Sequence, residues 1–147
     1  MVEVLIREAT EKEIAKIRKH AGFSFDWEQE LVHEVYKIYL KEHENEILGL
    51  LSLKDYPDEL RVHINLIEIT KTQVGQAKTL GNIAGCLIGF ACASAFKRGY
   101  GGFVSLLPKT RLIAHYQDKY GFRQYGRLLA VEYEQSKLLI DKYIGDE

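Results

Sequence analysis

Residues 62–69 read VHINLIEI and residues 80–93 read LGNIAGCLIGFACA, and these two segments decide the fold. The first predicts a buried strand, and the second predicts a long helix whose interior contains no charged residue. A second apolar run at 103–107 predicts another buried strand. Strand, loop, helix and strand in this order bring the first turn of a helix next to a sheet. Its unpaired N–H groups and positive dipole end favour an anion, so we expect a phosphate-bearing ligand at Gly81–Cys86.

Length and composition indicate a globular protein. The chain has 147 residues, of which 46% are hydrophobic and 28% charged, and we expect one domain spanning 1–147. The formal net charge of −1 produces no global field toward nucleic acid or an anionic membrane, so we expect neither as a partner. The N-terminal residues MVEVLIRE contain no basic region and no long apolar run, and therefore predict no signal peptide.

The uncharged run at 79–96 also raises the alternative of a transmembrane helix. We favour a core helix, because Asn82, Ser94 and several glycines dilute the run and the flanking segments alternate like strands of a soluble protein. Cys86 and Cys92 are expected to be small core residues, which agrees with a cytoplasmic location. Neither the two cysteines nor the five histidines have the spacing of metal ligands, so we expect no metal.

The N-terminal part predicts a strand, a helix and an aromatic segment. Residues 2–6 read as a short strand, and Thr10–Glu13 is a capping box that starts a helix through about His20. The segment 23–27, FSFDW, is unusually aromatic for a connection. Two interpretations stay open: these aromatics close one end of the core, or they form a wall of a pocket for an acceptor substrate.

Three strands follow, separated by short turns. Alternation of apolar and polar residues at 34–41 predicts the first, 47–53 reads as a mostly buried strand, and 60–69 is the third. Two short polar turns join them, so we expect an antiparallel meander.

The C-terminal third predicts a helix, a strand and a final helix. Thr110 is expected to cap a helix through Tyr120, and Gly121 fits the left-handed residue that ends it. Residues 126–134 read as one strand, and 136–143 as an amphipathic helix.

Two motifs within this element order carry a resemblance to a known family. The hexad Leu80–Gly85 is similar to the pattern Q/R-x-x-G-x-G/A, with a strict match only at its last glycine. The segment His115–Phe122 resembles a Y-x-x-x-G-F ending, with Tyr116 one residue further from the glycine. On these residues the sequence resembles the GCN5-related N-acetyltransferase (GNAT) family. The resemblance implies an α/β (α+β) acyl-CoA N-acyltransferase fold, with a mixed sheet of about six to seven strands and about four to five helices.

The resemblance also implies a site for acetyl-CoA where two central strands splay apart. Backbone groups of Ile67 and Ile69 would then face the pantetheine arm. The N–H groups expected to bind the pyrophosphate belong to the start of the helix, namely Gly81, Asn82, Ile83, Ala84, Gly85 and Cys86. Further contacts to the phosphates or to the cofactor's arm are expected from Lys78, Lys109 and Thr110.

Acetyl transfer to an amine requires a deprotonated amine, a polarised thioester carbonyl and a protonated leaving thiolate. Glu68, late in its strand, is the expected base, and the alternative is that it only reaches solvent at the strand end. His63 could be the base instead, or a hydrogen-bonded structural histidine. Tyr116 is expected to protonate the thiolate, with a core tyrosine as the alternative.

The sequence therefore predicts an N-acetyltransferase that moves an acetyl group from acetyl-CoA directly to a primary amine. No activated cysteine or serine is recognisable, so we expect no covalent intermediate. The acceptor, a small molecule or a peptide, stays open among a polyamine, an amino acid, an antibiotic and a protein lysine. A homodimer is one open assembly state. Two other functions stay open: a non-catalytic acyl-CoA-binding sensor or assembly protein of the same fold, and a structural α/β domain.

Overall fold

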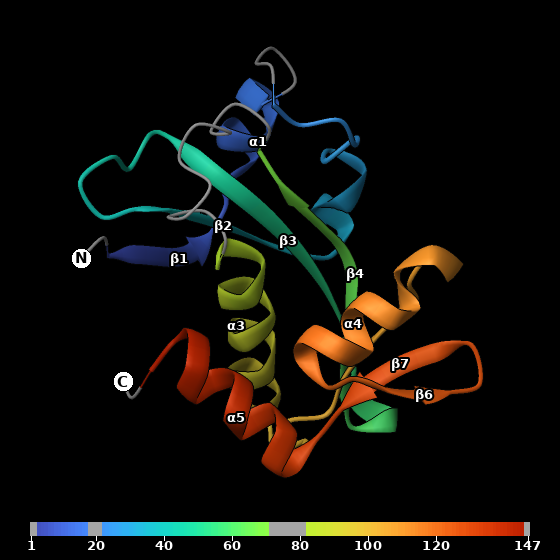
Figure 1. The fold of residues 1–147 in the computed structure, drawn as a ribbon. Coiled ribbons are helices and arrows are strands. Elements are labelled where there is room, and N and C mark those ends of the chain that lie inside the picture. The colour runs from blue at the N-terminus through green and yellow to red at the C-terminus, as the bar shows by residue number, and fades with distance from the viewer. Residues whose placement is uncertain (1–2, 18–21, 71–81, 146–147) are drawn as a thin grey trace. The chain divides into compact units, whose positions relative to one another are not determined.

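The computed structural model describes residues 3–17, 22–70 and 82–145. One mixed, seven-stranded sheet has the order β1-β2-β3-β4-β5-β7-β6 (Figure 1). Its strands are β1 (Val4–Glu8), β2 (Glu34–Leu40), β3 (Ile47–Tyr56), β4 (Arg61–Ile69), β5 (Val104–Leu106), β6 (Arg123–Tyr125) and β7 (Leu128–Val131). The α-helices within the described residues are α1 (Glu11–Ile17), α3 (Ile83–Lys97), α4 (Ile113–Tyr120) and α5 (Tyr133–Tyr143). This is the expected mixed sheet, in which β4 and β5 pair parallel.

The chain forms two compact units. The first comprises Met1–Ser52 and Leu66–Leu87, and the second comprises Leu53–Asn65 and Ile88–Glu147. Strands β3 and β4 and helix α3 each contribute residues to both units. In the first unit β1 pairs antiparallel with β2, and in the second β7 lies between β5 and β6 with antiparallel pairing on both sides.

Helix α1 starts at the predicted capping box. The Thr10 N–H donates to Glu13 Oε1 at 2.9 Å, and the Glu13 N–H donates to Thr10 Oγ1 at 3.2 Å. These bonds satisfy donors that a helix start otherwise leaves unpaired. The apolar side chains Ile14 and Ile17 are buried.

The aromatic segment after α1 closes the core of the first unit. Trp27 is only 1% exposed and is buried together with Ile14, Val35 and Leu50. Phe23 packs against the same residues, whereas Phe25 is half exposed. The interpretation that this segment closes one end of the core is confirmed for Trp27 and Phe23.

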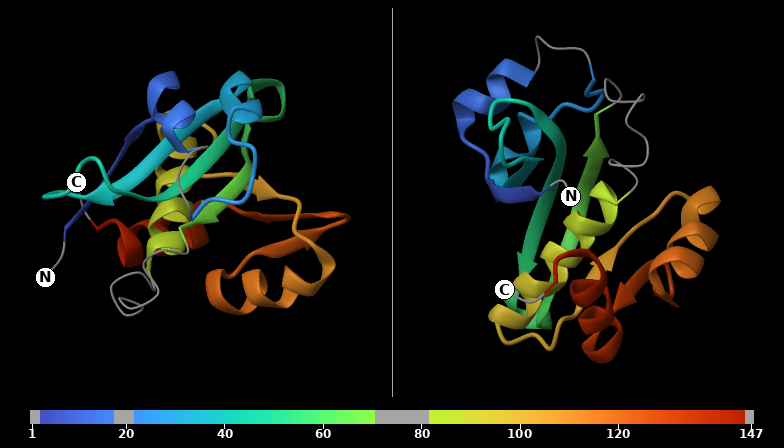
Figure 2. Two further views of the ribbon diagram at one scale, coloured as in Figure 1. Left: turned by 90° about the horizontal axis from the view of Figure 1, so that it is seen from above. Right: turned by 60° about the vertical axis from the view of Figure 1, so that its left-hand side comes forward.

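In the second unit the C-terminal half of α3 packs against α5, and the two helices lie side by side in both views (Figures 1 and 2). Gly89 makes this approach close, because a Cβ atom there would lie 3.1 Å from the Ile144 side chain and 3.3 Å from the Leu139 carbonyl oxygen. Tyr120 of α4 contacts Tyr143 of α5, with ring centroids 6.0 Å apart. Among the described residues, no helix is long and apolar enough to cross a membrane.

Three local predictions were wrong. Residues 126–134 form no single strand, because Gly126, with φ 62°, lies in the turn of a hairpin between β6 and β7. Thr110 caps no helix: it begins a 3-10 turn, Leu112 precedes α4, and neither helix start has a side-chain cap. Helix α5 begins at Tyr133, earlier than the predicted residue 136.

Candidate active site

The start of α3 is the predicted phosphate-binding turn. The helix begins at Ile83 after the exposed Asn82, and its first turn carries no acidic residue. The N–H groups of Ile83, Ala84 and Gly85 have no acceptor within the helix, as at any helix start. This turn therefore has the donors and the dipole that favour an anion.

Cys86, the last residue of the predicted phosphate-binding turn, has an acceptor for its N–H within the helix. Its N–H donates to the Asn82 carbonyl at 2.8 Å, because it is the first amide of the helix to find an acceptor four residues earlier. A contribution of Cys86 to pyrophosphate binding stays a prediction. Lys78 and Gly81, the other predicted contacts on this side, lie outside the described residues.

The edge of β4 extends beyond its pairing with β5. That pairing joins Val62–Ile64 to Val104–Leu106; β5 ends at Leu106, whereas β4 continues through Ile69. The Thr70 N–H donates to the Leu48 carbonyl of β3 at 2.9 Å. Because backbone groups alternate along a strand, those of Ile67 and Ile69 point away from β3.

Glu68 is buried and has three N–H donors. Its side chain is 7% exposed, and its Oε1 accepts from Trp27 Nε1 at 2.8 Å and from the Phe25 N–H at 3.3 Å. Oε2 accepts from the Ser24 N–H at 2.6 Å. The alternative of a side chain that reaches solvent is thus wrong, and the carboxylate anchors the segment Ser24–Trp27 to the end of β4. Sequence reasoning missed this contact.

Tyr116 lies on α4 among aromatic rings. Its ring centroid is 5.8 Å from that of Phe122 and 6.0 Å from that of Tyr120. Burial raises the pKa of its phenol, so the hydroxyl keeps its proton at neutral pH. Gly121 ends the helix in the left-handed conformation, with φ 73°, as the sequence predicts.

The predicted site residues are divided between the two units. The first unit holds Ile67–Ile69 and the start of α3 at Asn82–Cys86. The second unit holds Tyr116 together with Lys109 and Thr110, and these last two side chains are exposed at the start of the 3-10 turn before α4.

Both cysteines are buried free thiols, as expected for small core residues. Burial raises the pKa of the Cys86 thiol, and it raises that of Cys92 to about 12 despite a hydrogen bond with Ser136. Neither is therefore an activated nucleophile. Within the part of the chain that the structure describes, no group of three or more His, Cys, Asp or Glu side chains could hold a metal ion.

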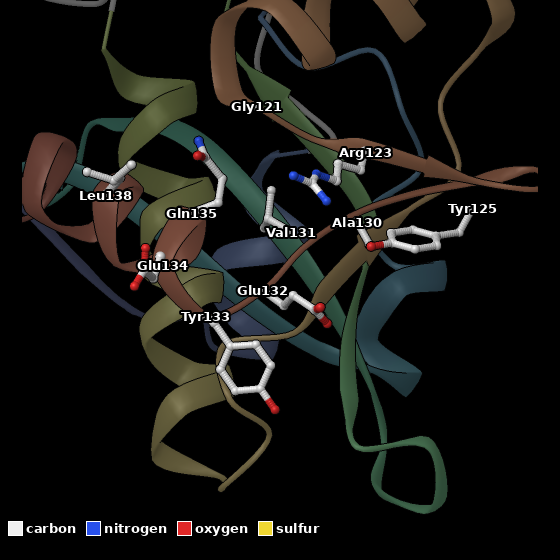
Figure 3. Close-up of a pocket in the computed structure, with 10 residues that line it drawn as sticks. All are labelled: Gly121, Arg123, Tyr125, Ala130, Val131, Glu132, Tyr133, Glu134, Gln135 and Leu138. Atoms are coloured by element: carbon white, nitrogen blue, oxygen red, sulfur yellow. The ribbon is translucent and has the colours of Figure 1, made fainter.

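A pocket of about 390 Å³ lies in the second unit between the β6–β7 hairpin and α5 (Figure 3). Arg123 and Tyr125 line it from β6, and Tyr133 and Gln135 from α5. Of the described residues predicted to bind acetyl-CoA, none lines this pocket. The sequence signal that could have revealed it is Gly126, a turn residue between two short strands.

Comparison with known proteins establishes the fold. No protein-family model and no curated protein sequence matches this chain. Among solved structures it is similar to AtaTR bound with acetyl-CoA, with a TM-score of 0.63 and 12% identity over 93% of this chain and 98% of that one. It is also similar to the spermidine/spermine N-acetyltransferase SpeG from Vibrio cholerae, with a TM-score of 0.63 and 13% identity over 95% of this chain and 98% of that one.

A third similar structure is a GNAT family acetyltransferase from Brucella melitensis in complex with acetyl-CoA. Its TM-score is 0.58 at 16% identity, covering 89% of this chain and 88% of the other. These likenesses confirm the expected fold: the chain has the acyl-CoA N-acyltransferase fold of the GNAT acetyltransferases.

Proposed function

We propose that this protein is an N-acetyltransferase that transfers the acetyl group of acetyl-CoA directly to a primary amine, in the cytoplasm. One observation carries the proposal: β4 continues to Ile69 after its pairing with β5 has ended at Ile64 and Leu106. Among the described residues no strand pairs with this part of the β4 edge. Such an edge can bind an extended ligand through its backbone, and we assign Ile67 and Ile69 to the pantetheine arm of acetyl-CoA. The fold neighbours with bound acetyl-CoA support this assignment.

We assign the diphosphate of acetyl-CoA to the first turn of α3. The N–H groups of Ile83, Ala84 and Gly85 would donate to it, with Asn82 at the rim and Lys78 and Gly81 from the preceding segment. Lys109 and Thr110 would contact the cofactor's arm. The cofactor supplies the acetyl thioester, and this chain's residues bind, orient and transfer protons.

Tyr116 is the proposed acid that protonates the leaving thiolate, and its raised pKa keeps the required proton in place. Glu68 is the proposed base. Three N–H groups bind its carboxylate, two of them at Oε1 and one at Oε2. A carboxylate has about four lone-pair sites, so Oε2 keeps a site at which it can accept a proton. We do not assign the base to His63. Its Nδ1 lies 2.9 Å from Ser105 Oγ, and burial with the charges of Arg61 and Lys54 lowers its pKa to about 4, which supports the other interpretation, a hydrogen-bonded structural histidine.

The hydrogen bonds of Glu68 favour a second candidate function, a non-catalytic acyl-CoA-binding protein of the same fold. In this case Glu68 only anchors the Ser24–Trp27 segment. Several acceptors stay open, since one similar structure is a spermidine/spermine N-acetyltransferase and another is complexed with acetyl-methionyl-tRNA.

Release of CoA thiol from acetyl-CoA, measured with a panel of primary amines, separates the two functions. An enzyme releases thiol with at least one amine above the rate of hydrolysis, whereas an acyl-CoA-binding protein is stabilised by acetyl-CoA without turnover. The variant Glu68→Gln tests the base. If Glu68 is the base, turnover falls while acetyl-CoA affinity is kept; unchanged turnover would remove Glu68 from the chemistry.

A further inference from the structure

A polar network covers one face of the sheet in the second unit. It consists of Lys54 and Tyr56 on β3, Arg61 and His63 on β4, and Ser105 on β5. The Arg61 guanidinium lies over the Tyr56 ring, with its Cζ 4.0 Å from the ring centroid, and Lys54 Nζ lies 4.9 Å from the same centroid. His63 contacts the Tyr56 ring edge-on at 6.1 Å and pairs across the parallel ladder with Ser105.

Hydrogen bonds fix the orientation of the imidazole. Arg61 Nη1 donates to Ser105 Oγ at 2.7 Å and lies 3.3 Å from His63 Nδ1. Ser105 Oγ is 2.9 Å from His63 Nδ1. Because Arg61 can only donate, the arrangement favours Nδ1 as an acceptor of the Ser105 hydroxyl proton, which places the ring proton on Nε2. The imidazole then offers its remaining nitrogen as a donor.

The network has an excess of positive charge. Glu59 is the carboxylate bonded to Arg61, at 2.7 Å, and it is 58% exposed at its side chain, while the Arg61 side chain is 13% exposed. Asp55 lies on the opposite face of β3, where it bonds Tyr100 and Arg98. In agreement, burial and then the charges of Arg61 and Lys54 lower the pKa of His63 to about 4.

We propose that Lys54, Arg61 and His63 form a binding site for an oxyanion, a carboxylate or a phosphate group. A guanidinium, an ammonium and an imidazole N–H are all donors, and an oxyanion is a ligand that accepts from all three. Arg61 is held by Tyr56, Ser105 and Glu59, so its guanidinium is ordered before a ligand arrives, which lowers the entropic cost of binding.

Binding is tested without any activity by following the imidazole of His63 by NMR. Acetate and inorganic phosphate serve as separate probes for the carboxylate and the phosphate. A bound anion favours the protonated imidazole, so we expect the pKa of His63 to rise from about 4 with at least one probe. A His63 titration that neither probe shifts overturns the proposal.

Two lysine variants provide the matched comparison. Lys54→Gln removes the ammonium above Tyr56, and Lys142→Gln removes a lysine held in the same manner, 5.3 Å from the Tyr143 ring centroid on α5. We expect Lys54→Gln to weaken binding of the effective probe about threefold to fivefold, a size typical of a partly exposed charge, and Lys142→Gln to leave it unchanged. Equal weakening by both variants would show a general charge effect and contradict a defined site.

Discussion

The indole nitrogen of Trp27 donates a hydrogen bond to the carboxylate of Glu68 over 2.8 Å. Both side chains are almost fully buried, at 1% and 7% exposure. This bond ties the aromatic segment after α1 to the end of β4, next to the strand edge that we assign to the pantetheine arm. A buried polar group is costly unless it is paired, so each partner depends on the other.

A double-mutant cycle measures this dependence. Trp27→Phe leaves Glu68 with one donor fewer, and Glu68→Gln replaces the charged acceptor of three N–H groups. We expect each single change to lower the free energy of unfolding by about 1–3 kcal/mol, with a coupling of at least about 0.5 kcal/mol between them. Urea unfolding followed by circular dichroism provides the values. Glu44→Gln, at an exposed ion pair with Arg7, is the control and should change stability by less than about 0.5 kcal/mol. If the losses in unfolding free energy of the two single variants add up to that of the double variant, Trp27 and Glu68 are not coupled.

His63 predicts a pH dependence of stability. Its pKa in the folded protein, lowered to about 4, is below the ordinary value of 6.5, so between these two pH values the imidazole is protonated in the unfolded chain but neutral in the folded one. The stability that neutral His63 allows is therefore fully present above about pH 6.5, and it is lost as the pH falls toward 4. We expect His63→Gln to flatten the free energy of unfolding between pH 7 and about pH 4.5, measured in urea. His43→Gln, at an exposed turn, should retain the slope of the parent, and an identical slope in both variants would argue against this assignment.

Alanine substitutions at Gly102 and Gly99 distinguish the cost of backbone strain from the cost of a steric clash. Both have positive φ, 73° and 84°, but a Cβ at Gly102 would lie 2.5 Å from the Phe96 ring, whereas a Cβ at Gly99 meets no described atom within 4 Å. We expect Gly99→Ala to cost about 1 kcal/mol of stability from strain, and Gly102→Ala to cost about 1–3 kcal/mol more. Thermal unfolding of the two variants is the measurement. Equal losses would mean that the Phe96 ring moves aside freely.

Tyr116→Phe tests the proposed acid. Removing the hydroxyl should lower kcat for acetyl transfer on the order of 10²-fold while the affinity for acetyl-CoA stays within about twofold, because a general acid acts in the transition state. Tyr125→Phe, a half-exposed tyrosine of β6, is the control and should keep parental turnover. Parental kcat in Tyr116→Phe would instead support its alternative role as a core tyrosine.

Much of the local structure was predictable because its signals lie within a few residues. The capping box at Thr10–Glu13 and the left-handed Gly121 are of this kind, and both are present. The meander followed from the two-residue alternation of β2 and the short turns after it. The hairpin between β6 and β7 was missed because its strands are too short to show alternation, so Gly126 was taken as the start of a longer strand.

The site contacts depend on pairs that are distant in the sequence. Trp27 and Glu68 are 41 residues apart, and His63 and Ser105 are 42 apart. Strand order and register bring such pairs together, and no local pattern encodes them. The sequence thus indicated Glu68 as a chemically important carboxylate, but not the three donors that bind it.

Calorimetric titration with acetyl-CoA tests most directly whether the α3 turn binds the diphosphate. The proteins compared are the parent and the variants Asn82→Asp and Asn45→Asp. Aspartate and asparagine are equivalent in front of a helix, so Asn82→Asp should fold normally while placing a negative charge where the diphosphate would bind. Asn45→Asp adds the same charge at an exposed turn. We expect the parent and Asn45→Asp to bind acetyl-CoA with similar affinity, and Asn82→Asp to bind it more weakly, by about fivefold or more. No binding by the parent, or equal affinity in all three proteins, would contradict binding of the diphosphate by the α3 turn.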